Sequence, residues 1–307
     1  MHDSHKRSLA ALERRGRLRA LSPARGLDFS SNDYLGLAQS DTLAVAARAA
    51  LDSGVPLGSG GSRLLRGNHP EHEALETEAA SHFGAETALF MGGGFTANTA
   101  LFATLPERGD LIVHDALIHA SVHDGMAASR AATKAALHNN AQSIDDVISG
   151  WRRDGGTGRA WIAIESLYSM DGDIAPIDEI AHVARRHDAM LVIDEAHATG
   201  VLGPGGRGLA AHLEGRDDII VLHTCGKALG VSGALVTLPA VLASYMINRA
   251  RPFIYATAPS PLIAATVRTS LKHVSEDATL RQRHASLVRH AGHHEVVGLD
   301  RPGAVDA

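Results

Sequence analysis

Short apolar runs alternate with longer alanine-rich stretches along most of the chain. Uncharged apolar runs are typical of buried strands, and we predict strands over residues 89–91, 111–113, 161–164, 191–193, 219–222 and 234–236. The stretches between them are rich in residues that favour helices, and we predict helices over residues 71–83, 97–104, 120–128 and 177–187. Strands that alternate with helices predict an α/β fold whose mostly parallel sheet is covered on both faces.

One uncharged segment, residues 228–248, is long enough to cross a bilayer. Glycine and serine residues interrupt it, and Pro239 divides it into a short strand and a new helix. We therefore predict a buried strand followed by a packed helix, and no membrane association. Residues 1–21 carry charges throughout and lack the apolar stretch of a secretory signal, so we expect no export.

The composition narrows the range of partners. With 29 Lys and Arg residues against 34 Asp and Glu residues, the formal net charge is −5, which disfavours binding to a nucleic-acid backbone. We therefore expect small-molecule partners and no nucleic acid. The single cysteine, Cys225, cannot form an internal disulfide or a cysteine zinc cluster, and a reducing, cytoplasmic location is the default expectation.

Polar residues follow the predicted strands at the point where each strand ends. In a parallel sheet these ends share one edge, where ligands bind. The first is the glycine-rich turn 92–96, whose backbone N–H groups could hold a phosphate, although glycine clusters also form plain tight turns. The other strand ends carry titratable or hydroxyl side chains: His114, Asp115, His119, Glu165, Ser166, Ser169, Asp194, Glu195, His197, His223, Thr224 and Lys227.

One of these segments copies a helicase motif. Residues 192–197 read Val-Ile-Asp-Glu-Ala-His, as in DEAH-type nucleic-acid helicases. A helicase also requires an upstream G-x-x-x-x-G-K-[ST] loop. The only Gly-Lys pair, at 226–227, lies downstream, is followed by Ala228, and has Val221 at the first glycine position. Residue order and residue identity therefore exclude the helicase interpretation.

The remaining strand-end residues match the needs of pyridoxal phosphate (PLP). This cofactor requires a lysine amine that forms a Schiff base, a carboxylate that keeps the ring nitrogen protonated, and an anion site for its phosphate. Lys227, Asp194 and the 92–96 turn supply one group of each kind, and a histidine can stack on the ring. A lone lysine is most often a solvated surface residue. The glycines and small hydroxyl residues around Lys227 argue against a surface position.

Five motifs between residues 28 and 274 resemble those of the α-oxoamine synthases, a family of fold-type I PLP enzymes. They span residues 30–37, 58–63, 165–173, 194–200 and 224–233. The 58–63 segment and its continuation through His69 look most like the 8-amino-7-oxononanoate synthase branch. The resemblance implies the large domain of the aspartate aminotransferase-like α/β fold, with pyridoxal 5'-phosphate as the cofactor.

The resemblance also implies roles for individual residues. Lys227 would carry the cofactor, Asp194 would contact the pyridine nitrogen and His119 would stack on the ring, and these three are the expected catalytic residues. Thr257 is expected to reach the phosphate of the other subunit, which implies a homodimer with shared active sites. Five further residues are expected to contact the cofactor: His197, Gly94, Phe95, Ser169 and Thr224. Asn32 is expected to contact the substrate.

The reaction implied by the resemblance joins two substrates. L-alanine condenses with a pimeloyl thioester, usually the coenzyme A ester, and CO₂ and the thiol are released. The product is 8-amino-7-oxononanoate, an intermediate of biotin biosynthesis. Relatives that use glycine share the cofactor residues, so another α-oxoamine is the alternative product.

The resemblance divides the chain into four parts. Residues 1–27 are expected to form an N-terminal helix or arm, residues 28–250 the PLP-binding large domain, residues 251–283 an interdomain helical region, and residues 284–307 an irregular tail. Family members continue into a small domain that supplies an arginine for the substrate carboxylate, and we expect that domain to be largely missing. Two interpretations follow, an active synthase or a truncated, weakly active or inactive PLP-binding homologue. The histidines of the tail are expected to form no metal site.

Overall fold

The structure, a computed structural model, describes residues 2–23 and 26–293. The chain divides into two units, Met1–Ser31 and Asn32–Ala307. Among its described residues the first unit contains one helix, α1 (Asp3–Arg14), and no residue of this helix is buried. The second unit contains the other helices and the strands of the described residues, and the candidate site lies within it.

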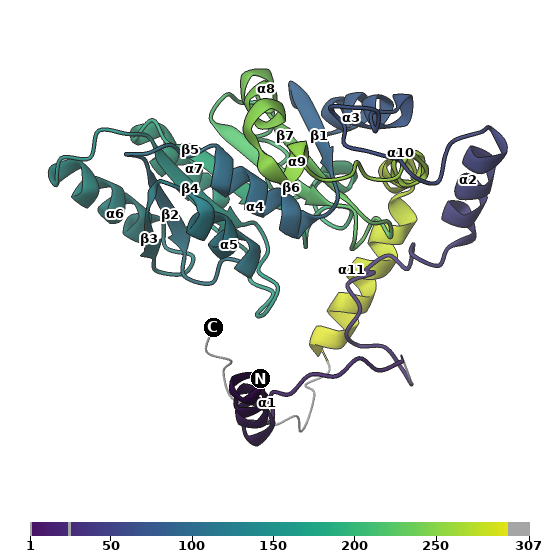
Figure 1. Cartoon of the computed structure of the whole chain (residues 1–307), viewed down its shortest axis with the longest axis horizontal. Helices are drawn as coiled ribbons and strands as arrows, with labels where there is room; N and C mark the ends of the chain where they lie inside the picture. Colours follow the sequence, from purple (N-terminus) through teal and green to yellow (C-terminus); the bar gives the residue numbers. More distant parts are fainter. Residues whose placement is uncertain (1, 24–25, 294–307) are drawn as a thin grey trace. The chain divides into compact units, whose positions relative to one another are not determined.

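A seven-stranded sheet organises the second unit (Figure 1). The strand order is β1-β7-β6-β5-β4-β2-β3, and β2 to β6 pair in parallel, whereas β7 runs antiparallel to both β6 and β1. The mostly parallel sheet predicted from the apolar runs is therefore confirmed. The strands are β1 (Thr87–Met91), β2 (Leu111–Asp115), β3 (Ala132–Ala136), β4 (Ala160–Glu165), β5 (Met190–Asp194), β6 (Ile219–Thr224) and β7 (Ala234–Leu238).

The edge strand β3 falls outside the predicted set. Its sequence, Ala-Thr-Lys-Ala-Ala, contains no long apolar run, and its first four residues are exposed. It lies at the end of the sheet beside β2, where a strand needs backbone pairing but little side-chain burial. Hydrophobic patterning alone therefore gives no signal for it.

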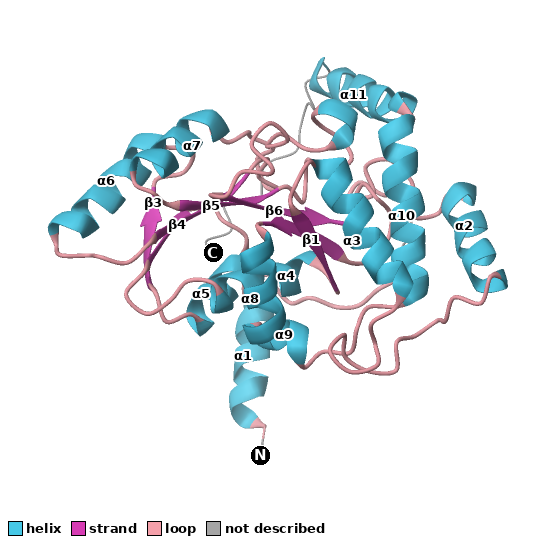
Figure 2. Ribbon diagram, turned by 90° about the horizontal axis from the view of Figure 1, so that it is seen from above, coloured by secondary structure: helices cyan, strands magenta, loops and turns pink. Residues whose placement is uncertain are grey.

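Helices cover both faces of the sheet, as expected (Figure 2). Successive residues of β2 alternate between two cores, since Ile112 belongs to one and both Leu111 and Val113 belong to the other. The first core includes α4 (Gly94–Thr104), α5 (Ala120–Ala128), α8 (Ala240–Arg249) and α9 (Arg251–Ile254). The opposite face is covered by α6 (Ala141–Arg153) and α7 (Ile177–Arg186) and, around β1 and β7, by α2 (Asp41–Asp52), α3 (Pro70–Phe83) and α10 (Pro261–Glu276).

The uncharged segment 228–248 forms the predicted strand and helix. Strand β7 is buried throughout, and Pro239 ends it and precedes the first residue of α8. The buried Ala243 and Met246 of α8 pack in the first core. Among the helices of the described residues, none has the length and apolarity needed to span a membrane.

The C-terminal helix of the described residues corrects one prediction. We predicted an irregular tail from residue 284, but residues 284–293 form the second half of helix α11 (Ala278–His293). Leu280 and His284, four residues apart, are both half-buried, so one face of the helix is partly covered. The helix is mostly polar, so hydrophobic patterning gives little signal for it. Residues 294–307, the rest of the predicted tail, lie outside the described residues.

Candidate functional site

A pocket opens at the carboxyl ends of β4, β5 and β6, beside the N-termini of α4 and α5. Grooves of about 560, 590 and 630 Å³ lie elsewhere on the same unit, but none of them is lined by a predicted site residue. The chemistry of the lining, and not its size, therefore identifies the candidate site. This strand-end pocket is lined by Gly94, Phe95, Asn98, His119, Ser121, Glu165, Asp194, Ala196, His197, Thr224 and Lys227.

One end of the strand-end pocket offers hydrogen-bond donors to an anion. Helix α4 begins at Gly94, and no side chain caps its first turn, so its backbone N–H groups face outward from the helix end. A methyl group on Gly94 would lie 3.5 Å from Thr224 Oγ1, which places the Thr224 hydroxyl against this turn. The structure thus brings together Gly94, Phe95 and Thr224, the residues predicted as a phosphate cradle.

Asp194 ends β5 in the floor of the pocket and is 7% exposed. Its Oδ2 accepts a hydrogen bond from Asn98 Nδ2 at 2.7 Å, and its Oδ1 accepts one from the backbone N–H of Ala196 at 2.9 Å. Both carboxylate oxygens are therefore fixed in position. Sequence reasoning missed Asn98, although an asparagine among the buried apolar residues of α4 is the kind of signal that marks a buried polar contact.

The same asparagine connects Asp194 to His119. Asn98 Nδ2 also donates to Ser121 Oγ at 3.0 Å, and the Ser121 hydroxyl donates to His119 Nδ1 at 2.8 Å. His119 is the N-cap of α5, and its Nδ1 also accepts the backbone N–H of Ser121 at 3.2 Å. The network fixes the imidazole ring of His119, an exposed residue of the pocket lining.

Lys227 and His197 form the closest contact in the pocket. Lys227 Nζ lies 2.5 Å from His197 Nε2, and His197 Nδ1 lies 2.6 Å from the hydroxyl of Tyr34. Burial lowers the pKa of Lys227, against the opposing effect of the negative charges of Asp194 and Glu165. Burial and the positive charge of Lys227 lower the pKa of His197 to about 4. The ring of His197 is therefore neutral at physiological pH, and the fraction of neutral amine at Lys227 is raised.

Glu165 is a pocket residue to which the sequence analysis gave no role. It ends β4 and pairs in register with Asp194 at the end of β5, so two carboxyl groups lie on neighbouring strands. Burial, and then the charge of Asp194, raise the pKa of Glu165 to about 8, although the charge of Lys227 opposes the shift. Glu165 is therefore mostly protonated at neutral pH.

Three predicted site residues do not line the pocket of this chain. Ser169 and Thr257 are both exposed, the first in the turn after β4 and the second after α9. Asn32 is also exposed, and its Oδ1 accepts a hydrogen bond from Tyr34 at 3.1 Å. Asn32 is thus connected to His197 through Tyr34, another residue that received no predicted role.

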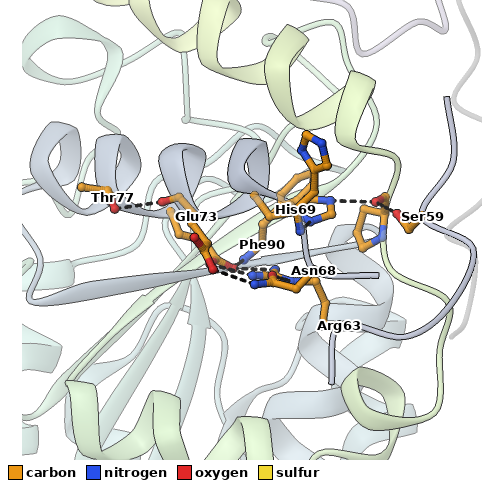
Figure 3. Close-up of polar contacts among 10 residues, drawn as sticks. Ser59, Arg63, Asn68, His69, Glu73, Thr77 and Phe90 are labelled. Carbon is orange, nitrogen blue, oxygen red and sulfur yellow. Dashed lines mark hydrogen bonds and ion pairs between the residues drawn. The ribbon is translucent and has the colours of Figure 1, made fainter. Parts of the chain in front are cut away.

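A second group of polar residues surrounds the start of α3 (Figure 3). Arg63 donates two parallel hydrogen bonds to Glu76, at 2.8 and 2.9 Å. His72 is fully buried and both of its ring nitrogens are used, because Nδ1 accepts from the His69 backbone and Nε2 donates to the Pro259 carbonyl. We call this group the α3 polar cluster; it consists of Ser59, Arg63, Asn68, His69, His72, Glu73, Glu76, Thr77 and Pro259.

The contacts of the α3 polar cluster are made within the protein. The histidines and glutamates that follow residue 68 are therefore used to hold the start of α3 in place. Across residues 2–23 and 26–293, no group of three or more metal-binding side chains is present.

Comparisons with known proteins fit this geometry. The family model for class I and II aminotransferases matches residues 24–293. An 8-amino-7-oxononanoate synthase from Chromobacterium violaceum is 39% identical over 262 residues, which cover 85% of this chain and 67% of that sequence. The chain covers 64% and 66% of two further curated relatives that carry the same name.

Solved structures show the same resemblance. A serine palmitoyltransferase variant from S. paucimobilis, solved with a bound PLP–myriocin aldimine, superposes with a TM-score of 0.81 at 26% identity, covering 94% of this chain and 78% of that chain. An 8-amino-7-oxononanoate synthase from Francisella tularensis superposes with a TM-score of 0.72 at 29% identity, covering 89% of this chain and 78% of that chain.

Proposed function

Because the chain belongs to the class I and II aminotransferase family, and within it to the α-oxoamine synthases, we propose that it condenses L-alanine with a pimeloyl thioester. The product would be 8-amino-7-oxononanoate, with release of CO₂ and the thiol. One observation carries the proposal: Lys227, Asp194 and His119 line a single pocket beside an uncapped helix N-terminus. The relative that is 39% identical bears the name of this activity.

The donor set of the strand-end pocket fits PLP. The α4 N-terminus and the Thr224 hydroxyl suit a phosphate, the anchored Asp194 carboxylate suits a protonated ring nitrogen, and Lys227 supplies the only lysine amine in the lining. His119 at the rim suits contact with a ring face. We propose that these residues hold the cofactor, with His197 beside Lys227.

When bound, PLP supplies an electron-poor ring that stabilises the negative charge left on a substrate carbon when a bond to it breaks. The residues of the chain prepare the pocket for that chemistry. Asp194 provides a fixed negative charge because two N–H groups hold its carboxylate. Glu165, mostly protonated, adds no second negative charge beside it.

Lys227 is proposed to move the substrate protons. Its lowered pKa raises the fraction of neutral amine, which can accept the α-proton of alanine at Nζ and later return a proton. His197 remains neutral and in contact with this amine. The Asn98–Ser121 network fixes His119, so that its ring restricts access to one side of the pocket.

The proposal includes a homodimer in which Thr257 acts in the pocket of the other subunit. Thr257 is exposed and lies outside the pocket of its own chain. The neighbouring backbone N–H of Ala258 donates to the Gly61 carbonyl at 2.9 Å, which holds this segment in place on the surface. Thr257 is therefore available to a second copy of the chain.

Mixing two inactive variants tests the shared site. In a mixed dimer of Lys227→Ala and Thr257→Ala subunits, a shared arrangement leaves one pocket with both changes and one pocket with neither. We expect mixing and re-equilibration to restore activity that each variant lacks alone. If each subunit uses its own Thr257, mixing restores nothing.

The activity itself is tested with the PLP-treated chain, L-alanine and pimeloyl-coenzyme A. We expect thiol release, CO₂ release and formation of 8-amino-7-oxononanoate in equal amounts, with lower rates for glycine and serine. A spectral change with alanine but no thiol release would instead support the inactive PLP-binding homologue. A clear preference for glycine or serine would assign a different α-oxoamine product.

A further inference from the structure

A chain of three short contacts runs from the strand-end pocket to the protein surface. Lys227 Nζ lies 2.5 Å from His197 Nε2, His197 Nδ1 lies 2.6 Å from the Tyr34 hydroxyl, and that hydroxyl lies 3.1 Å from Asn32 Oδ1. Lys227 and Tyr34 are half-buried, His197 is buried and Asn32 is exposed. The contacts join two segments, around residues 32–34 and 197, that are far apart in sequence.

The single hydroxyl hydrogen of Tyr34 determines which atom donates and which accepts in each of these contacts. A phenol has one proton, and Tyr34 donates it to Asn32 Oδ1. The oxygen of Tyr34 must then accept at its other contact, so His197 Nδ1 carries a hydrogen and donates it to Tyr34. A neutral imidazole has only one N–H, so Nε2 is unprotonated and accepts a hydrogen bond from the Lys227 amine.

The tautomer of His197 decides the state of the Lys227 amine. A neutral amine has two hydrogens and one lone pair. When it donates one hydrogen to an unprotonated Nε2, its lone pair points away from His197 and stays free for the pocket. In the other tautomer, an Nε2–H group would donate into that lone pair and occupy it.

We infer that Tyr34, held by Asn32, is a positioning residue that fixes His197 in the Nδ1–H tautomer and so keeps the Lys227 lone pair free. The half-buried Tyr34 ring also forms a T-shaped contact with the ring of His284 in α11, with ring centroids 5.8 Å apart, which helps to hold the Tyr34 ring in place. The importance of a free lone pair rests on the proposed function, but the tautomer itself is a property of the protein without cofactor.

The tautomer is measured directly by NMR. In ¹⁵N-histidine-labelled protein free of PLP, at neutral pH, the His197 ring signals are those that disappear in His197→Gln. We expect them to show a protonated Nδ1 and an unprotonated Nε2. An Nε2–H tautomer in the unchanged protein would overturn the inference.

Two variants and a matched control complete this test. Tyr34→Phe removes the acceptor of the Nδ1–H group, and Asn32→Ala frees the Tyr34 proton to be donated to Nδ1, so both are expected to shift His197 toward the Nε2–H tautomer. Tyr245→Phe removes a hydroxyl that lies near Glu107 and away from the pocket, and it is expected to leave the His197 signals unchanged. Signals of Tyr34→Phe and Asn32→Ala that match the unchanged protein would contradict the inference.

The uptake of PLP by the cofactor-free protein provides a second readout. We expect Tyr34→Phe to take up PLP about tenfold more slowly, the size expected for losing one buried hydrogen bond, and Tyr245→Phe to match the unchanged protein. Equal rates in all three would contradict the role of Tyr34. If the unchanged protein bound no PLP, the proposed function would fail, while the NMR result would still decide the tautomer.

Discussion

The strand-end pocket and the α3 polar cluster both bring together basic residues, carboxyl groups and histidines, but they use them differently. In the α3 polar cluster, Arg63 and Glu76 neutralise each other through two hydrogen bonds, and both ring nitrogens of His72 are bonded. In the pocket, Lys227 forms no ion pair with any described residue, and Glu165 is kept mostly protonated by burial. The two regions contain similar residue types, but charged groups are paired in the α3 polar cluster and not in the pocket.

This difference has an energetic meaning. Buried polar groups whose partners are present stabilise the fold, and removing one partner leaves an expensive unpaired charge. Groups with shifted pKa values and open hydrogen-bond capacity are costly to the fold and mark sites of chemistry. Substitutions in the pocket should therefore change activity more than stability, and substitutions in the α3 polar cluster should do the reverse.

The largest effect is expected from Lys227→Ala. Removing the amine eliminates both the proposed attachment point for PLP and the proposed proton acceptor, so turnover should be abolished. The cofactor-free variant should be at least as stable as the unchanged protein, because a half-buried amine that has no ion pair among the described residues is lost. Thiol release and urea unfolding measure the two quantities. Substantial residual turnover would refute the assignment of Lys227. A large loss of stability would contradict the expected difference between the pocket and the α3 polar cluster.

Asp194→Asn is expected to have the next largest effect. The amide is close in shape but lacks the negative charge, so PLP should still bind while exchange of the alanine α-hydrogen slows by about a hundredfold or more. The rate of deuterium incorporation into alanine measures this step. Glu78→Gln, a change at an exposed carboxylate that is not part of the pocket lining, serves as the control. A near-normal exchange rate in Asp194→Asn would count against a role for its charge.

In the α3 polar cluster, Glu76→Gln should act on stability instead. The side chains of Arg63 and Glu76 are only 9% and 15% exposed, and the change leaves the guanidinium without its charged partner. We expect the free energy of unfolding to fall by about 3 kcal/mol, with PLP uptake retained. The more exposed pair of Arg268 and Glu78 gives a matched comparison, and Glu78→Gln should cost only about 0.5 kcal/mol. Equal losses of unfolding free energy in Glu76→Gln and Glu78→Gln would show that burial does not determine how much each ion pair stabilises the fold.

A further effect on stability is the pH dependence contributed by Glu165. Unfolded, this residue ionises near 4.5, whereas in the folded protein its pKa is about 8. Between these values the folded state retains a proton that the unfolded state has lost, so a rise in pH through this window destabilises the fold. Glu165→Gln removes this contribution.

The stability of Glu165→Gln relative to the unchanged protein should therefore increase as the pH rises. We expect the difference to grow on the order of a few kcal/mol between about pH 5 and about pH 8, as measured by urea unfolding without PLP. The exposed Glu78→Gln change should show no such growth. A difference that stays constant with pH would mean that Glu165 is ionised throughout.

Residues at the ends of strands were the part of the site most accessible to sequence reasoning. Asp194, Thr224 and Lys227 follow fully buried apolar runs, and the parallel order of the sheet brings these ends to one edge. The glycine-rich turn before α4 also follows an apolar run, so its position at this edge of the sheet could be predicted as well. Edge strand β3 could not, because its exposed residues leave no apolar pattern.

Contacts between distant segments were the part that sequence reasoning could not supply. Asn98 meets Asp194 across 96 positions, and Tyr34 meets His197 across 163 positions. No local sequence pattern predicts these contacts, because they depend on how α4 and the segment before α2 pack against the sheet. The raised pKa of Glu165 likewise depends on burial and on its pairing partner, which only the fold provides.

The central claim is that Lys227 carries PLP, and peptide mapping after borohydride reduction tests it most directly. The sequence contains only four lysines, Lys6, Lys134, Lys227 and Lys272, so each can be mapped separately. The other three side chains are exposed and outside the strand-end pocket. We expect the reduced phosphopyridoxyl group on the Lys227 peptide alone. No adduct on that peptide, or equal labelling of the exposed lysines, would contradict the account.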